Sequence, residues 1–212
     1  MVSRRELDTL VLDVEFVLIS VVQGVALTTL AVESTAVLRT GHFEAWPYAL
    51  SGLLFVLTFW SAALIHAISF VRWPMDLVHY FFYFGLALLE CLTFSQLEHP
   101  RGWFALSIAC YVVTLALYAY DFFLIRRRRT FFEGSEAERA LYHHIEARQR
   151  LEFLLLVPGG LVFCVAAWRL LATRPEAAFA LGVSQAVVSA AFLASLVRSF
   201  ARRQALLLAT AE

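Results

Sequence analysis

The sequence predicts an all-α protein that crosses a membrane six times, and two observations carry this prediction. Of its 212 residues, 61% are hydrophobic. They gather in six apolar stretches, each long enough to cross a hydrocarbon core of about 30 Å as a helix. The 17 basic residues, all of them arginine, fall mostly into alternate connecting segments. Because no stretch is left for a soluble module, we treat residues 1–212 as a single transmembrane domain.

The predicted spans are defined by their apolar content and by the polar segments between them. They cover approximately residues 10–32, 48–70, 75–97, 103–125, 151–171 and 177–197. Four of the connecting segments are short, which predicts tight hairpins in which consecutive helices are antiparallel neighbours. Tryptophan and tyrosine at the span ends predict an aromatic belt at the two membrane surfaces. Its members are Trp46, Tyr48, Trp73, Trp103 and Trp168.

The longer segment before the fifth span predicts a cytoplasmic helix over about residues 135–150. Ser135 and Glu138 have the spacing of a capping box, and Glu146 and Arg150 form an i,i+4 pair in the favoured order. This helix is expected to run directly into the fifth span. There, residues 158–160 (Pro-Gly-Gly) predict either a kink or a broken helix with freed carbonyl groups.

The distribution of arginine predicts how the chain is oriented. If the first helix enters from the cytoplasm, the outer segments carry only Arg39, Arg101, Arg169 and Arg174. All other arginines then lie on the inner side, and a bias of this size in short loops places both termini in the cytoplasm. Such a chain suits the inner membrane of a bacterial cell. The formal net charge of zero gives no case for nucleic-acid binding.

Polar residues on the first span are candidates for lining a pore. Asp13, Ser20, Gln23 and Thr28 fall on one stripe of that helix at steps of three, four and seven residues. A polar stripe at membrane depth faces either water or the interior of a helix bundle, because a polar group against lipid is costly. Three other spans carry similar stripes. These contain Thr58, Ala62 and His66; His79, Tyr83 and Glu90; and Ser107, Thr114, Tyr118 and Asp121.

The ionisable residues Glu90, His66, His79 and Asp121 are candidates for an ion or proton site. A charge at the centre of a bilayer costs about 2.5–3.5 kcal/mol on insertion scales, so such residues usually serve a function or form a pair. Glu90 could instead pair with Gln23, Gln185 or a tyrosine. The two histidines could be interfacial anchors or a hydrogen-bonded pair, and Asp121 could balance the four arginines that follow it.

The first four spans resemble those of the prokaryotic relatives of the lysosomal potassium and proton channel. The similar features are Leu12-Asp13-Val14-Glu15-Phe16, Thr58-Phe59-Trp60, the segment Phe70-Val71-Arg72-Trp73 and an aromatic third span. The Phe-Ser-Asp motif of that family is absent, and Asp13 and Trp60 are the positions that carry over. The resemblance implies six-span subunits that assemble around their first helices and conduct cations.

Three functional hypotheses follow. The first is a homo-oligomeric channel or small transporter for monovalent cations, potassium or protons, in a lipid bilayer. The second is a membrane enzyme that holds a metal or haem with His66, His79, Asp121 and Asp13. The third is a non-catalytic subunit or effector that binds a protein partner through the helix at 135–150. No motif indicates a catalytic residue or a particular cofactor, and the sequence names no metal.

Overall fold

A computed structural model describes residues 4–69, 77–127 and 136–209, with side chains for 13–65, 77–127, 136 and 139–205. Within these ranges the chain forms seven α-helices, short 3₁₀ and π segments, and no strand. The helices are α1 (Arg4–Thr40), α2 (Trp46–Ser69), α3 (Leu77–Phe94), α4 (Pro100–Arg127), α5 (Glu136–Leu151), α6 (Val157–Leu170) and α7 (Ala178–Ala209).

Six helical stretches are long and apolar enough to cross a membrane, which confirms the predicted number of spans. They are Asp13–Thr40, Phe43–Ile65, Leu77–Phe94, Pro100–Arg127, Arg139–Leu170 and Pro175–Ala205. The first and last helices extend well past the predicted spans, because their flanking residues are good helix formers with no proline or glycine to interrupt them. Gly41 ends α1 in the left-handed conformation, with φ of 73°. The orientation of the chain in the membrane stays a prediction.

The predicted helix at 135–150 and the fifth span form one continuous rod, as expected. α5 passes through a π-helical segment, Glu152–Leu156, directly into α6. Pro158 has no N–H to donate to the carbonyl of Leu154, and the wider π turn just before the proline accommodates this irregularity. The rod is therefore irregular but not broken. The Glu146–Arg150 pair is present at 2.8 Å, whereas Ser135 lies outside the described residues and the capping box stays a prediction.

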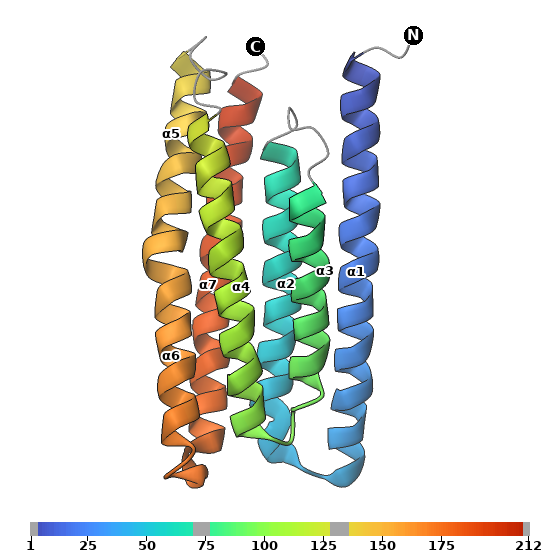
Figure 1. Cartoon of the computed structure of the whole chain (residues 1–212), viewed down its shortest axis with the longest axis vertical. Coiled ribbons are helices and arrows are strands. Elements are labelled where there is room, and N and C mark those ends of the chain that lie inside the picture. Colours follow the sequence, from blue (N-terminus) through green and yellow to red (C-terminus); the bar gives the residue numbers. More distant parts are fainter. Residues whose placement is uncertain (1–3, 70–76, 128–135, 210–212) are drawn as a thin grey trace.

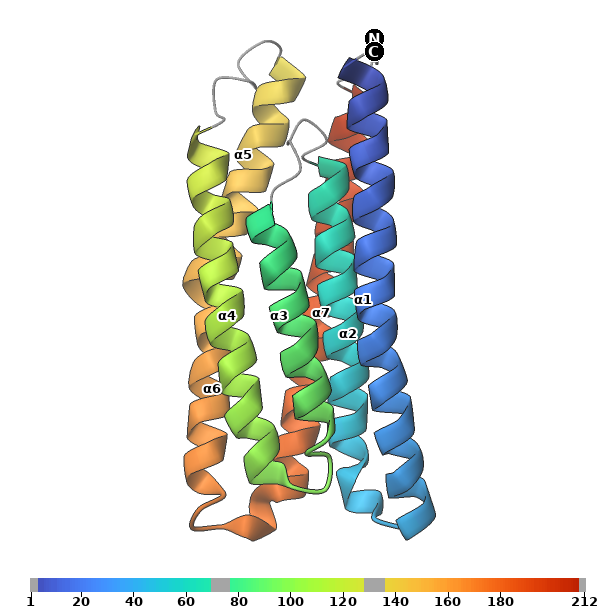
Figure 2. The ribbon, with the colours of Figure 1, turned by 45° about the vertical axis from the view of Figure 1, so that its right-hand side comes forward.

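The six spans form a ring of helices that lie along a common axis, in which some neighbours run antiparallel and others, such as α2 and α7, run parallel (Figures 1 and 2). α1 packs against α2 and α3, α3 against α4, α4 against α6, and α2 against α7, while α5 contacts α7 and completes the ring. The start of α1, the end of α7 and all of α5 lie at one end of the bundle. We call this the α5 end, and the opposite end the hairpin end.

An aromatic cluster fills the ring near the hairpin end. It consists of Tyr48, Phe94, Trp103 and Phe104, all of which are at most 1% exposed. The rings of Tyr48 and Trp103 meet edge-to-face with their centroids 5.5 Å apart. Tyr48 and Trp103 were predicted as belt residues, and this prediction is wrong because both side chains point into the core. Their polar atoms are satisfied there: Tyr48 donates to the Ala178 carbonyl at 2.6 Å.

Close packing of α2 against α1 and α3 depends on a glycine. A Cβ atom on Gly52 would lie 2.8 Å from Leu30 Cδ1 and 3.0 Å from Phe94 Cε1. The replacement Gly52→Ala is therefore expected to destabilise the protein by about 1–3 kcal/mol, as overpacking does in other cores. Gly85→Ala is the matched control, because no heavy atom lies within 4 Å of its Cβ position. Thermal unfolding of both variants in one detergent measures the difference, and equal midpoints would contradict it.

Candidate functional site

A cavity of about 440 Å³ lies inside the ring of helices. It is bounded by α2, α3, α4, α7 and the rod of α5 and α6, and no described residue of α1 lines it. Most of its wall is apolar, with Leu86, Leu117, Val157 and Leu196 among the lining residues. A concave, largely apolar space with a few polar groups is typical of a small-molecule binding site.

The polar stripes of three helices meet in this cavity. α2 contributes Thr58, α3 contributes Tyr83 and Glu90, and α4 contributes Thr114, Tyr118 and Asp121. The expectation that polar stripes face the bundle interior is therefore met for these three helices. Other apolar side chains of these helices, such as Leu88 and Val112, are exposed on the outside of the ring.

Glu90 lines the cavity on the side away from the α5 end. It is 6% exposed, and it accepts a hydrogen bond from Gln23 Nε2 at 3.2 Å. Among the described residues, no basic side chain forms an ion pair with Glu90. Of the three partners considered from the sequence, Gln23 is the one present, whereas Gln185 accepts a hydrogen bond from Trp103 Nε1 at 2.7 Å.

His79 and Asp121 form a buried pair between α3 and α4. His79 Nε2 lies 2.7 Å from Asp121 Oδ1, and both side chains are less than 9% exposed. Of the four arginines that follow Asp121 in the sequence, Arg126 stacks over Phe122, 4.3 Å from the ring centroid, whereas Arg128 and Arg129 lie outside the described residues. The side chain of His66 lies outside the described residues, so its predicted role stays a prediction.

The α5 end of the cavity holds a charged group that the sequence analysis missed. Glu152 and Arg203 line the cavity and are 5% and 7% exposed. Arg148 forms an ion pair with Glu152 through Nε, and its Nη1 donates to Ser195 Oγ at 2.7 Å. The sequence places Arg148 and Arg203 only among the arginines of the inner side. The i,i+4 spacing of Arg148 and Glu152 was the available signal, because it marks a possible pair on one helix face.

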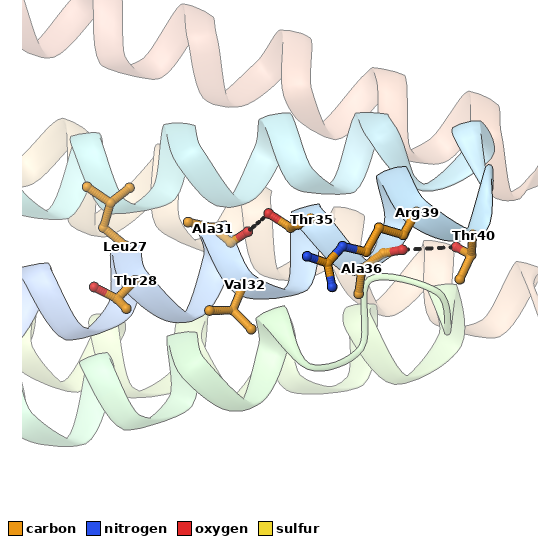
Figure 3. A pocket seen from close by; sticks show the side chains of 8 residues that line it. All are labelled: Leu27, Thr28, Ala31, Val32, Thr35, Ala36, Arg39 and Thr40. Atoms are coloured by element: carbon orange, nitrogen blue, oxygen red, sulfur yellow. Dashed lines mark hydrogen bonds between the residues drawn. The ribbon is translucent and has the colours of Figure 1, made fainter.

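The four candidate pore residues of α1 are not brought together on one surface. Gln23 is buried against α3, whereas Asp13, Ser20 and Thr28 are exposed on the outside of the ring. Thr28 donates its hydroxyl hydrogen to the Gly24 carbonyl at 2.8 Å. A shallow hollow runs along the outer face of α1 from Leu27 to Thr40 (Figure 3). Any path lined by Ser20 and Thr28 would therefore lie outside the ring of one chain.

The cavity is closed at the hairpin end and open at its side. Phe55 and Tyr111 line it and pack against each other, and Phe55 stacks on Trp103 of the aromatic cluster. No member of that cluster lines the cavity. By contrast, Leu151 and Val188, which do line it, are 41% and 51% exposed.

The cavity holds the carboxylate of Glu90 in an apolar wall and the charged group of Glu152 and Arg203 at the α5 end. Such side chains can bind and release a small ligand or ion. Among the residues that the structure describes, no three of His, Cys, Asp and Glu are placed to hold a metal ion. The side chain of His66, one of the four residues named for a metal or haem, lies outside the described residues, so that hypothesis stays a prediction.

Comparison of the chain with protein-family models, with curated proteins and with solved structures finds no match. The resemblance to prokaryotic relatives of the lysosomal channel stays a prediction.

The buried ion pair provides a test of the site's architecture. In Arg148→Gln, the buried Glu152 loses its ion pair while Arg203 remains near it, and the loss of the charged hydrogen bond is expected to cost about 1.5–3 kcal/mol of stability. Arg150→Gln is the control: it breaks the pair with Glu146, but the Arg150 side chain is 53% exposed. Such a surface pair contributes only about 0.3–0.5 kcal/mol. Thermal unfolding of the two purified variants distinguishes them, and a similar small effect in both would show that the Arg148 pair is not structural.

Proposed function

We propose that this protein is a small integral membrane transporter that takes up a proton or a monovalent cation at Glu90. The observation that carries the proposal is the cavity inside a single bundle, with this carboxylate in its wall. A carboxylate in an apolar space has to be neutralised by a proton, a cation or a basic side chain. Its described hydrogen-bond donor is the neutral amide of Gln23, which leaves a proton or a mobile cation to fill this role.

A transporter fits the closed end of the cavity better than a channel through one chain. A channel needs a continuous passage, whereas the aromatic cluster of Tyr48, Phe94, Trp103 and Phe104 separates Glu90 from the hairpin end. A transporter requires such a barrier on one side at a time. The rings are held by packing and by the Trp103–Gln185 hydrogen bond, so opening at that end would require helices α4 and α7 to separate there.

Cation or proton flux into proteoliposomes tests this function. A potassium diffusion potential drives the flux, and an internal pH-sensitive dye reports proton entry. Flux above that of empty liposomes is expected for the unmodified protein. Glu90→Gln is expected to reduce it to the level of empty liposomes, because the amide has the same size but cannot take up a proton or balance a cation.

The matched control is Glu44→Gln, which changes an exposed carboxylate in the loop before α2 and should leave the flux unchanged. Gel filtration of each variant establishes that it is folded. Full flux in a folded Glu90→Gln variant would overturn the role of Glu90, and no flux in the unmodified protein at any pH or voltage would overturn transport.

A second candidate is the channel that the sequence predicted, formed by the first helices of several subunits. The observation that favours it is the exposure of Ser20 and Thr28 on the outer face of α1, beside Gly24, where a Cβ atom would meet no other residue of the chain. Small residues on an exposed helix face allow another helix to approach closely. In this arrangement, monovalent cations would pass between subunits of a homo-oligomer.

Cysteine cross-linking tests this second candidate. In a background with Cys91, Cys110 and Cys164 replaced by alanine, Ser20→Cys is expected to form disulfide-linked dimers in native membranes. Val187→Cys is the control, since Val187 is 63% exposed on α7, away from α1. Dimers at both positions, or at neither, would argue against specific assembly around α1.

The hypothesis of a partner-binding subunit has less support. The apolar side chains Leu141, Tyr142 and Ile145 of α5 are buried within the chain, where α5 contacts α7. A protein partner would therefore meet the charged outer face of this helix, which carries Arg139 and Arg150.

A further inference from the structure

We propose that the cavity binds a hydrophobic organic cation, with its positive charge at Glu90 and its apolar body against the aromatic side chains of the wall. The inference deepens the proposed function by naming the class of cation that Glu90 takes up, and it rests on that function only for the transport of this cargo. Binding itself requires no transport, so the two can be tested separately.

The charges in the cavity wall favour a positive ligand. Three carboxylates and one basic side chain line the cavity, and these are Glu90, Asp121, Glu152 and Arg203. Glu152 pairs with Arg148, and Asp121 bonds with His79. Glu90 is therefore the carboxylate of this wall that meets neither a histidine nor an arginine among the described residues.

Arg203 lies far from Glu90 along the bundle. It follows Gln185 by 18 residues on α7, which is about 27 Å along a helix, and Gln185 bonds to Trp103 in the aromatic cluster. Glu90, by contrast, precedes Phe94 of that cluster by 4 residues. Because Coulomb repulsion falls with distance, a cation bound at Glu90 is only weakly repelled by the guanidinium group at the α5 end.

The protein satisfies the Glu90 carboxylate only in part. Gln23 Nε2 donates to Oε2 at 3.2 Å, and no described residue donates to the second oxygen, Oε1. The side chain is nevertheless only 6% exposed. A carboxylate in such a place is costly unless a positive charge or a proton balances it, so a bound cation lowers the free energy of this site.

Aromatic side chains form much of the cavity wall around the carboxylate. Phe55 and Tyr111 meet with their ring centroids 6.3 Å apart, and Phe59 and Tyr83 meet at 5.7 Å. All four line the cavity, and Tyr83 precedes Glu90 by 7 residues, which places both on one face of α3. Aromatic rings attract organic cations through their electron-rich faces, so rings and carboxylate together suit a positive ligand.

The size and polarity of the cavity favour an organic cation over a bare one. A bare potassium ion needs several oxygen atoms in place of its hydration shell, whereas Leu86, Leu117, Val157 and Phe192 present carbon to this space. The volume of about 440 Å³ falls within the usual range for ligands of drug size. The apolar body of an organic cation fills such a space and gains free energy by leaving water.

Binding of radiolabelled tetraphenylphosphonium to the protein in lipid nanodiscs tests the inference. Saturable binding above that of empty nanodiscs is expected, with competition by unlabelled tetraphenylphosphonium. Triphenylphosphine oxide, which has a similar body without the charge, and tetramethylammonium, which has the charge without the body, should compete much less. Equal competition by the neutral compound would overturn the role of charge, and equal competition by tetramethylammonium would overturn the role of the apolar wall. No saturable binding would overturn the inference as a whole.

Two pairs of variants locate the ligand. Glu90→Gln is expected to weaken binding about tenfold or more, because it removes the opposite charge from a buried pair, while the exposed Glu44→Gln leaves binding unchanged. Phe59→Leu is expected to weaken binding about threefold to tenfold, because it removes an aromatic face. Its control is Phe81→Leu, since Phe81 is 75% exposed on the outside of α3. Should Glu90→Gln not fold, the second pair still tests the site, and equal effects within either pair would overturn it.

The binding assay has no ion gradient, so its outcome is independent of the flux assay. Saturable binding without Glu90-dependent flux would leave the ligand site standing and remove the transport function. Proton or potassium flux without binding would leave the transport function standing and overturn the organic cation as its cargo.

Discussion

A polar side chain inside a bilayer has to find its partner within the protein, and this requirement determines how the helices are joined. Lipid tails offer no hydrogen bonds, so an unsatisfied polar group at membrane depth carries the full cost of its desolvation. The polar contacts of this chain accordingly join different helices. Among the described residues, those that join different helices include Gln23–Glu90 between α1 and α3, His79–Asp121 between α3 and α4, Trp103–Gln185 between α4 and α7, and Arg148–Ser195 between α5 and α7.

These contacts help to fix the rotation of the helices, and the cavity lies where the polar stripes of α2, α3 and α4 meet. The aromatic cluster fills the ring at the hairpin end, whereas the cavity lies beyond it. Gly160 contributes by leaving room for the ring of Tyr111, which lies against it. The π segment before Pro158 carries Glu152 to the cavity wall. The irregular part of the fifth span therefore contains its candidate functional residue, Glu152, and π segments are often found at functional sites.

Much of this fold was predictable because the signals are local. The six spans follow from apolar content, and the continuous rod follows from the absence of a helix-breaking residue between Glu136 and Leu156. For Glu90 the sequence left open an ion or proton site or, as the alternative, pairing with Gln23, Gln185 or a tyrosine. Sequence periodicity says which residues share a face of one helix, but it does not say which neighbour that face meets. For this reason the sequence could list possible partners of Glu90 but could not choose among them. For the same reason it placed Trp103 at the membrane surface, although this side chain lies in the core.

The sequence by itself determined the membrane class, the number of spans and the polar stripes, since each depends on composition and on the helical repeat alone. Only the tertiary structure decided that α1 stands at the edge of the cavity, so that Gln23 faces inwards while Ser20 and Thr28 face outwards. It also brought Arg203 of α7 to the same cavity wall as Glu152, which pairs with Arg148 four residues earlier on the rod. The physical reason is that ring order and helix rotation depend on packing and hydrogen bonding between helices, and these contacts leave no trace in the periodicity of any one helix.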